Sequence, residues 1–210
     1  MIFIVNSDNR CCFAADLADM HRHRKAVFVD GNGWRVPVSA GMEMDCYDRA
    51  DTIYLLAKEA PGGPLLASVR LIPTAGPHLM CQLFPDASQD IPRGPSIWEV
   101  SRFCTTPTLR GRCARRDLLW PIICGVMETA LLFGMDQLTF AANSALLPLT
   151  LDCGWEARRL GPTMRDGNDE VTAVAVTVTP AGLRQVRQRY GVPAPITRYP
   201  VCLKRRERHD

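Results

Sequence analysis

Apolar and polar residues alternate along this chain with two different periods. Ile2 to Val5 is a short apolar run that predicts a buried strand, and the segment from about Asn9 to Phe28 repeats its apolar residues with a helical period. Further on, Thr52 to Lys58 and Leu65 to Ile72 flank the Gly- and Pro-rich segment 60–64, a pattern that predicts a β-hairpin. The first third of the chain is therefore expected to contribute a strand, a helix and an antiparallel strand pair.

The remainder of the chain predicts further strands and helices in alternation. Strands are expected at Ile97 to Cys104, Gln137 to Ala142 and Glu170 to Val178, and helices at Leu79 to Phe84, Ala114 to Phe133, Ser144 to Leu151 and Pro180 to Tyr190. Ser144 is the expected N-cap of its helix. Strict alternation along the first of these strands would place Glu99 and Arg102 on opposite faces. This order predicts an α/β fold: a single domain built on a twisted mixed sheet flanked by helices.

A long loop is expected between the first helix and the hairpin. Residues 30–45 carry three glycines and Pro37 without a hydrophobic period, and long loops in compact domains are frequently functional. No internal repeat or linker divides the chain. One domain is therefore expected over residues 1–203, followed by a basic tail over residues 204–210.

Composition narrows the class of protein. The 210 residues are 47% hydrophobic and 22% charged, a globular balance that excludes a largely disordered chain. The formal net charge of +3 is too small to indicate nucleic-acid binding, and no apolar run approaches the roughly 18 residues that span a bilayer. The first ten residues lack the basic and long apolar regions of a signal peptide. We therefore expect a cytoplasmic protein that binds neither nucleic acid nor membrane.

The cysteines are numerous but follow no binding pattern. The chain has nine of them and no CxxC pair, and Cys11 and Cys12 are adjacent. This distribution argues against a disulfide framework and favours a reducing compartment. His21 and His23 lie nearby in sequence, but their spacing to Cys11 and Cys12 matches no standard zinc pattern. Neither a disulfide framework nor a metal site is therefore expected.

Six charged residues lie in segments that also carry core-type residues. They are the cations Arg24, Arg70 and Arg102 and the anions Asp45, Asp48 and Glu99. Charges inside buried elements are costly unless they are paired. The set is therefore either a structural network of salt bridges or the polar lining of a cleft for a zwitterionic substrate, and the residues alone leave both interpretations open.

An arginine-rich segment precedes the helix expected at Ala114 to Phe133. Residues 110–112, Arg-Gly-Arg, resemble the loop with which GNAT N-acyltransferases bind the pyrophosphate of acyl-coenzyme A through backbone amides at a helix N-terminus. Cys113 and Arg115 stand where that loop has small residues, which argues against tight coenzyme A binding. The segment is instead either a cationic surface for an acidic carrier protein or a solvated basic helix end. Its arginines are Arg110, Arg112, Arg115 and Arg116.

Five motifs in order make the chain similar to a known family. They are Arg24-x-x-x-Phe28, Trp34, Glu43-x-Asp45-x-Tyr47-Asp48, Ser68-Val69-Arg70-Leu71-Ile72-Pro73-Thr74 and Trp98-Glu99-Val100-Ser101-Arg102-Phe103. This set resembles the acyl-homoserine-lactone synthases, the autoinducer synthases of bacterial quorum sensing, and covers about the first half of the chain. The departures lie mostly in the arginine-rich loop and in residues 141–144, where acyl-chain preference would be set. The resemblance implies a GNAT-like acyltransferase fold.

The resemblance also implies a reaction in two steps. The α-amine of S-adenosylmethionine attacks an acyl thioester to give an amide, and the methionyl carboxylate then attacks its own γ-carbon, which closes the lactone and releases methylthioadenosine. The thioester is expected on acyl carrier protein, with acyl-coenzyme A as the alternative donor. S-adenosylmethionine is a substrate, and no cofactor is implied.

Roles for the charged set follow from the same resemblance. Glu99 is the expected base for the amine, or the holder of a water that acts as one, while the two aspartates hold the ammonium and sulfonium groups. Arg24 and Arg102 orient carboxylates, and Arg70 braces the aspartates across the sheet. Phe28 and Trp34 either are plain core aromatics or cover the adenosylmethionine, where an aromatic face over a sulfonium gains about 1 kcal/mol.

The acyl thioester is expected to meet a different part of the chain. Backbone amides around Phe103 and Cys104 would polarise its carbonyl as an oxyanion hole, and Cys104 is no nucleophile because its motif offers no histidine. The acyl chain or the carrier arm is expected at Ala142, Asn143 and Leu146. Several further apolar residues either line an acyl tunnel or simply belong to the core, namely Leu118, Ile122, Met127 and Leu149.

Two other functions stay open on the sequence. One is a different GNAT enzyme that N-acylates another amine from acyl-coenzyme A, and the other is a non-catalytic protein that binds acyl thioesters. Release of methylthioadenosine distinguishes both from a synthase.

Overall fold

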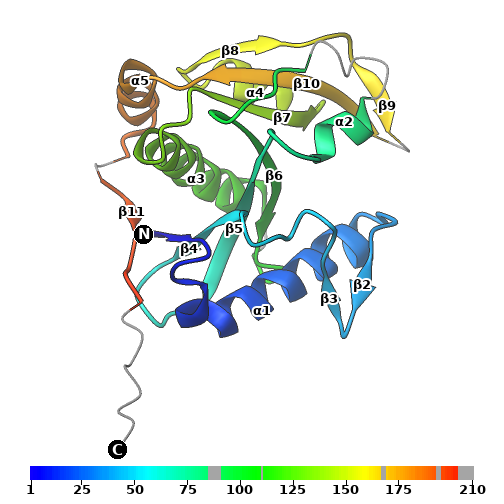
Figure 1. Cartoon of the computed structure of the whole chain (residues 1–210), viewed down its shortest axis with the longest axis vertical. Coiled ribbons are helices and arrows are strands. Elements are labelled where there is room, and N and C mark those ends of the chain that lie inside the picture. The colour runs from blue at the N-terminus through cyan, green and yellow to red at the C-terminus, as the bar shows by residue number, and fades with distance from the viewer. Residues whose placement is uncertain (85–90, 110, 167–168, 193–194, 203–210) are drawn as a thin grey trace, which may run out of the picture.

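A nine-stranded mixed sheet is the centre of the computed structural model (Figure 1). The structure describes residues 1–84, 91–109, 111–166, 169–192 and 195–202, with the side chains of residues 112–116 and 166 excepted. The strands of the main sheet are β1 (Ile2–Val5), β4 (Ile53–Lys58), β5 (Leu65–Pro73), β6 (Ile97–Thr105), β7 (Gln137–Asn143), β8 (Glu156–Arg159), β9 (Met164–Asp166), β10 (Asp169–Thr177) and β11 (Thr197–Arg198). A separate small sheet pairs β2 (Val38–Ser39) with β3 (Met42–Glu43).

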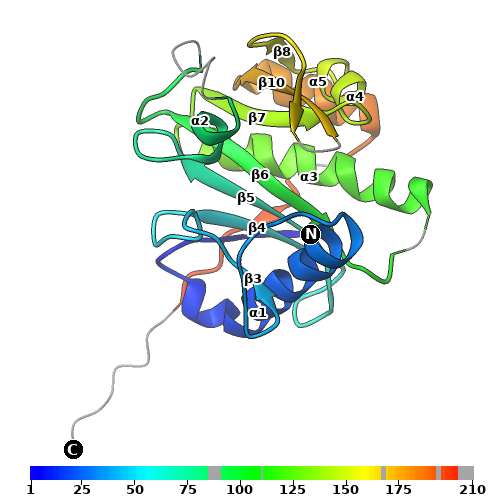
Figure 2. The ribbon, with the colours of Figure 1, turned by 90° about the vertical axis from the view of Figure 1, so that its right-hand side faces the viewer.

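Helices cover both faces of the main sheet (Figure 2). They are α1 (Ala14–Arg24), α2 (Leu79–Leu83), α3 (Arg112–Leu132), α4 (Leu147–Leu151) and α5 (Pro180–Tyr190), and α1 continues a 3-10 turn at Arg10–Phe13 and runs into a π-helical segment at Lys25–Gly31. Alternation along β1 decides which helix meets which face. Phe3 and Val5 pack with Met20 of α1, whereas Ile2 and Ile4 join the larger core that contains the apolar residues of α3. None of the helices in the described part of the chain is both long enough and apolar enough to cross a bilayer.

The main sheet is mostly antiparallel and has a weak seam. Its order is β11-β1-β4-β5-β6-β7-β10-β8, with β9 also paired to β10, and its parallel pairs are β1 with β11 and β6 with β7. The β6–β7 pairing is confined to Ile97 with Gln137, Trp98 with Leu138 and Glu99 with Thr139. From residue 100 onward, β6 therefore presents toward β7 an edge that β7 does not pair.

A β-bulge corrects the expected alternation of β6. Ser101 lies opposite Arg70 and Cys104 lies opposite Ser68, so Arg102 and Phe103 together face the single residue between those two. Arg102 has a φ of +55°, in the left-handed region that non-glycine residues rarely adopt. The extra residue turns the Arg102 side chain to the acids that also bind Arg70. The prediction from strict alternation, that Arg102 lies on the face of β6 opposite to Glu99, is therefore wrong.

Other expectations are confirmed or corrected element by element. The hairpin β4–β5 and the helices α2, α3 and α5 lie where they were predicted. The expected loop over residues 30–45 begins after Gly31 and contains the β2–β3 hairpin. The helix expected from Ser144 begins at Leu147, because the Asn143 side chain accepts the Leu146 N–H at 3.0 Å and closes a turn there. The short strands β8, β9 and β11 were not predicted.

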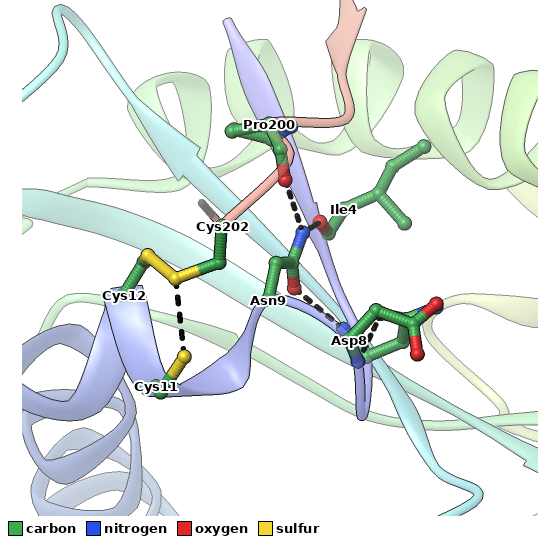
Figure 3. Close-up of a disulfide and its surroundings, with 8 residues drawn as sticks. Ile4, Asp8, Asn9, Cys11, Cys12, Pro200 and Cys202 are labelled. Atoms are coloured by element: carbon green, nitrogen blue, oxygen red, sulfur yellow. Dashed lines mark hydrogen bonds between the residues drawn. A yellow bond between two sulfur atoms is a disulfide. The ribbon is translucent and has the colours of Figure 1, made fainter. Parts of the chain in front are cut away.

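The end of the described chain returns to its beginning. β11 pairs with β1 in parallel, and Cys202 forms a disulfide with Cys12 across 190 residues of sequence (Figure 3). The expectation that the cysteines are unpaired is therefore wrong for this pair. His21 lies elsewhere, where its Nδ1 is 2.8 Å from the backbone oxygen of Glu43. The basic tail expected over residues 204–210 lies outside the described residues.

Candidate active site

Three arginines and three carboxylates meet between α1, the small sheet and the centre of the main sheet. Arg24 ends α1, Arg70 lies in β5 and Arg102 lies in β6. The acids are Glu43, Asp45 and Asp48, which lie in β3 and in the turn that follows it. We call these six residues the ionic cluster. All six are largely or wholly buried, with equal numbers of positive and negative charges.

Arg24 joins two of the acids. Its Nε donates to Glu43, and its Nη1 and Nη2 donate to the two carboxylate oxygens of Asp48 at 2.8 and 2.9 Å. Tyr54 also donates its hydroxyl to Asp48, at 2.8 Å. Burial alone would raise the pKa of Asp48, but the hydrogen bonds and charge of Arg24 outweigh it and hold that pKa well below its ordinary value. Asp48 is therefore a fixed anion.

Arg70 and Arg102 complete the cluster from the main sheet. Arg70 binds both oxygens of Asp45, at 2.6 and 3.0 Å, and lies 3.1 Å from Asp48. Arg102 donates to Glu43 at 3.1 Å and to Asp45 at 2.8 Å. Because each acid has at least two arginine partners and each arginine two acids, the six side chains hold one another in place.

The third acid of the cluster is Glu43, and not Glu99 as the sequence suggested. Glu43 is fully buried and binds both Arg24 and Arg102. It stands two residues before Asp45 in the third of the five motifs, and this position could have identified it as a site residue. Tyr54 and Ser101, whose hydroxyl accepts from Arg70 Nε at 3.1 Å, were also missed.

Glu99 stands beside the cluster with a different environment. It is 1% exposed, and its Oε2 accepts the backbone N–H of Met80 at 2.9 Å. Burial raises the pKa of Glu99 to about 7, although the Met80 N–H and the charge of Arg70 oppose that rise. Glu99 can therefore exchange its proton near neutral pH.

An aromatic pair covers one side of the cluster. Phe28 lies in the π-helical segment and Trp34 follows it, and the Trp34 N–H donates to the Phe28 oxygen at 2.8 Å. This bond brings the rings into a stack with centroids 4.7 Å apart. The Arg102 guanidinium lies 5.8 Å from the Phe28 ring and 5.7 Å from the Trp34 ring. Phe28 is buried but Trp34 is 36% exposed, so the stack forms an outer wall.

A pocket of about 640 Å³ opens on another side, beside Tyr47. The Tyr47 ring lines it and also lies 5.8 Å from the Arg70 guanidinium. His78 and Cys81 also line it, and they come from around α2, the helix that supplies the Met80 N–H to Glu99. The pocket therefore adjoins both Arg70 and the segment that holds Glu99.

The residues expected at the acyl thioester lie in β6, in β7 and just after β7, beyond the three residue pairs that join these two strands. Phe103 is in the bulge, on the stretch of β6 that β7 does not pair. Ala142 is buried in the main core, Leu146 packs against that core, and Asn143 is occupied with the Leu146 N–H. The further apolar residues Leu118, Ile122, Met127 and Leu149 belong to or pack against the same core.

The arginine-rich segment is described only in part, because the structure gives the backbone of residues 111–116, where α3 begins at Arg112, but not their arginine side chains. Arg110 lies outside the described residues, and the side chains of Arg112, Arg115 and Arg116 are likewise not described. The contact expected there with a carrier protein stays a prediction.

Comparison with known proteins gives this arrangement a family. A family model described as autoinducer synthase matches residues 9–186. The chain belongs to the autoinducer synthase family. This autoinducer synthase is 31% identical over 180 residues to an acyl-homoserine-lactone synthase of Ralstonia nicotianae, covering 83% of the chain and 87% of the relative. It is therefore an acyltransferase of the acyl-homoserine-lactone synthase class.

Solved structures agree with this assignment. The autoinducer synthase is similar to BjaI, a CoA-dependent acyl-homoserine-lactone synthase solved with SAM and isopentyl-CoA, with a TM-score of 0.85, 28% identity and coverage of 97% of this chain and 94% of that one. A protein of Lactobacillus plantarum described as an N-acetyltransferase shares the fold alone, at a TM-score of 0.56 and 19% identity over 85% of this chain and 99% of that one. The predicted GNAT-like fold is thus confirmed.

Proposed function

We propose that this autoinducer synthase transfers an acyl group from a thioester to the α-amine of S-adenosylmethionine and then closes the homoserine lactone. The observation that carries the proposal is the ionic cluster, neutral in sum, beside a buried carboxyl group whose pKa is about 7. S-adenosylmethionine carries a carboxylate, an ammonium and a sulfonium group. A charge-balanced site with both signs at its surface suits such a molecule.

The outer members of the cluster are the groups we assign to substrate contact. Asp45 and Arg102 have side chains 9% and 6% exposed, whereas Arg24, Glu43 and Asp48 are at most 1% exposed. Asp45 then binds the ammonium or sulfonium end and Arg102 the carboxylate. Arg24, Glu43 and Asp48 fix the positions of these two, and Arg70 braces Asp45. Trp34, the exposed half of the aromatic stack, covers the sulfonium.

Glu99 is the base in this proposal. A carboxylate attacks an ammonium proton best when its pKa is near the working pH, which burial brings about here. The proton of the α-ammonium passes to Glu99, directly or through one water, and the free amine attacks the thioester carbonyl. The C–S bond of the thioester breaks, and the thiol of the donor leaves with a proton.

Acylation prepares the second step. The methionyl carboxylate attacks the γ-carbon, the bond from that carbon to the sulfonium breaks, and the electron pair stays with sulfur as neutral methylthioadenosine. We assign the oxyanion of the first step to the backbone amides near Phe103, because β7 does not pair with the edge of β6 there.

Two donors fit different observations. The arginine-rich segment at residues 110–116 favours an acidic acyl carrier protein, and this carrier is the donor we propose first. The similarity to BjaI, which is described as CoA-dependent, favours acyl-coenzyme A as the second candidate.

One experiment tests the reaction and the donor together. The purified protein is incubated with S-adenosylmethionine and the same acyl group on carrier protein or on coenzyme A, and methylthioadenosine and lactone are measured by chromatography and mass spectrometry. We expect both products in equal amounts, with the higher kcat/KM for the carrier. Acylation without methylthioadenosine would identify a different N-acyltransferase, and turnover of neither donor over several acyl lengths would contradict catalysis.

A further inference from the structure

Three cysteine sulfur atoms meet where the two ends of the described chain come together. Cys11 and Cys12 lie in the 3-10 turn before α1, and Cys202 follows β11 (Figure 3). Their sulfur atoms all lie within 4.8 Å of one another. The proposed acyl transfer uses none of them.

The third cysteine is in contact with the existing bond. Cys12 and Cys202 form the disulfide, and Cys11 Sγ lies 3.1 Å from Cys202 Sγ (Figure 3). A separation of about 3–3.5 Å is the distance at which reacting atoms are held before attack. Cys11 and Cys12 are exposed and Cys202 is half-buried, so a soluble thiol can also approach the site.

We propose that Cys11, Cys12 and Cys202 form a thiol–disulfide exchange site in which Cys202 is bonded alternately to Cys11 and Cys12. The Cys11 thiolate attacks Cys202 Sγ, and the bond between these two sulfurs forms as the bond from Cys202 to Cys12 breaks. Cys12 leaves as a thiolate and takes up the proton that Cys11 gave up. No electrons enter or leave, so the step needs no external oxidant or reductant.

The surrounding contacts keep Cys202 in place during this exchange. Asn9 donates its side-chain N–H groups to the Ile4 oxygen at 2.9 Å and to the Pro200 oxygen at 3.0 Å (Figure 3). Tyr199 donates its hydroxyl to Asp8 at 3.0 Å. These bonds dock the segment before Cys202 on the N-terminal turn without using either Cys11 or Cys12. Cys202 therefore stays beside both partners whichever of them it is bonded to.

The exchange has a consequence for the loss of one cysteine. A bond across 190 residues closes a long loop and so restricts the unfolded chain strongly. With two alternative partners, the chain ends stay joined when Cys12 is replaced, but not when Cys202 is replaced.

Peptide mapping tests the proposal without any activity assay. Trypsin digestion of acid-quenched, alkylated protein should yield peptide 11–22 linked to peptide 199–204, and fragmentation of that pair distinguishes the two bonds. In the wild type we expect both bonds, and in Cys12→Ser the pair linked through Cys11. Cys12→Ser should unfold within about 2 °C of the wild type, whereas Cys202→Ser should lose the linked pair and roughly 10 °C in Tm.

Matched samples keep the test decisive. Cys46→Ser removes an exposed cysteine elsewhere and should change neither the map nor Tm. If Cys202→Ser does not fold, the wild type reduced with a dithiol supplies the unlinked reference. Alkylation of both Cys11 and Cys202 in Cys12→Ser, with a Tm equal to that of the unlinked reference, would overturn the proposal.

Discussion

Replacement of Glu99 by Gln separates an acid–base role from a purely structural one. Gln keeps the shape of the side chain and an oxygen that can accept the Met80 N–H, but it cannot take a proton from the substrate amine. General-base catalysis contributes about 10²- to 10⁴-fold, so we expect Glu99→Gln to lower kcat/KM by that factor. In the wild type, activity should rise with pH through about 7, where the pKa of Glu99 lies.

The same substitution should make the protein more stable at alkaline pH. Burial raises the pKa of Glu99 from 4.5 to about 7, so the free energy of unfolding contains no penalty from this group below pH 4.5. Between pH 4.5 and 7 the unfolded chain loses the proton first and stability falls, and above pH 7 the penalty is constant. The shift corresponds to about 3 kcal/mol. Glu99→Gln should therefore unfold roughly 5–10 °C above the wild type at pH 8 but close to it at pH 4.5.

Two measurements on the same variants check this reasoning. Methylthioadenosine release is followed from pH 5.5 to 9, and thermal unfolding is recorded at pH 4.5 and 8. Glu59→Gln is the control, because Glu59 is exposed and should change neither quantity. Unchanged turnover in Glu99→Gln would remove the catalytic assignment, and a loss of stability at pH 8 would refute the elevated pKa on which the assignment depends.

Three other substitutions address the ionic cluster and its aromatic wall. Glu43→Gln removes a charged partner from two buried arginines, Arg24 and Arg102, and should cost about 3–5 kcal/mol of stability in urea unfolding. A change below 1 kcal/mol would contradict its place in the cluster. The pKa of Asp48 is held below its ordinary value of 3.8, so the ionised Asp48 stabilises the folded protein above about pH 4, and this stabilisation is lost as pH falls. Between pH 6 and 3, Asp48→Asn should therefore lose less stability than the wild type. Trp34→Ala should raise KM for S-adenosylmethionine about five-fold and leave that for the acyl donor unchanged, while Leu132→Ala, at another exposed position, should alter neither.

Much of the fold followed from local signals. α5 has the predicted bounds, and the structure gives the local reason: Thr179 caps it, Pro180 opens it and Gly191, with a φ of +63°, ends it. β8 and β11 escaped prediction because they are short and largely exposed, so they carry no hydrophobic period. Their positions are set by pairing with β10 and β1, which a local pattern does not encode.

The sequence predicted most of the residues of the site, but not which of them bind one another. Arg24, Asp45 and Arg70 were expected to meet, and they do. That Glu43 takes the place expected for Glu99 depends on the bulge that turns Arg102, a feature of the register between two strands. The disulfide joins two cysteines that are 190 positions apart in the sequence, and a local sequence pattern does not predict such a pair. The catalytic roles remain predictions.

The short pairing of β6 with β7, which consists of three residue pairs, lies between the two groups of proposed substrate contacts. The ionic cluster, which we propose binds the amino-acid substrate, comes from α1, β3 and the turn after it, β5 and β6, whereas the expected acyl contacts Ala142, Asn143 and Leu146 lie in β7 and just before α4. Substitutions among the expected acyl contacts therefore change side chains that do not belong to the ionic cluster. In the proposed reaction, such substitutions would alter the acyl group of the product while the lactone stays the same, so related enzymes could share one chemistry and still make different signals.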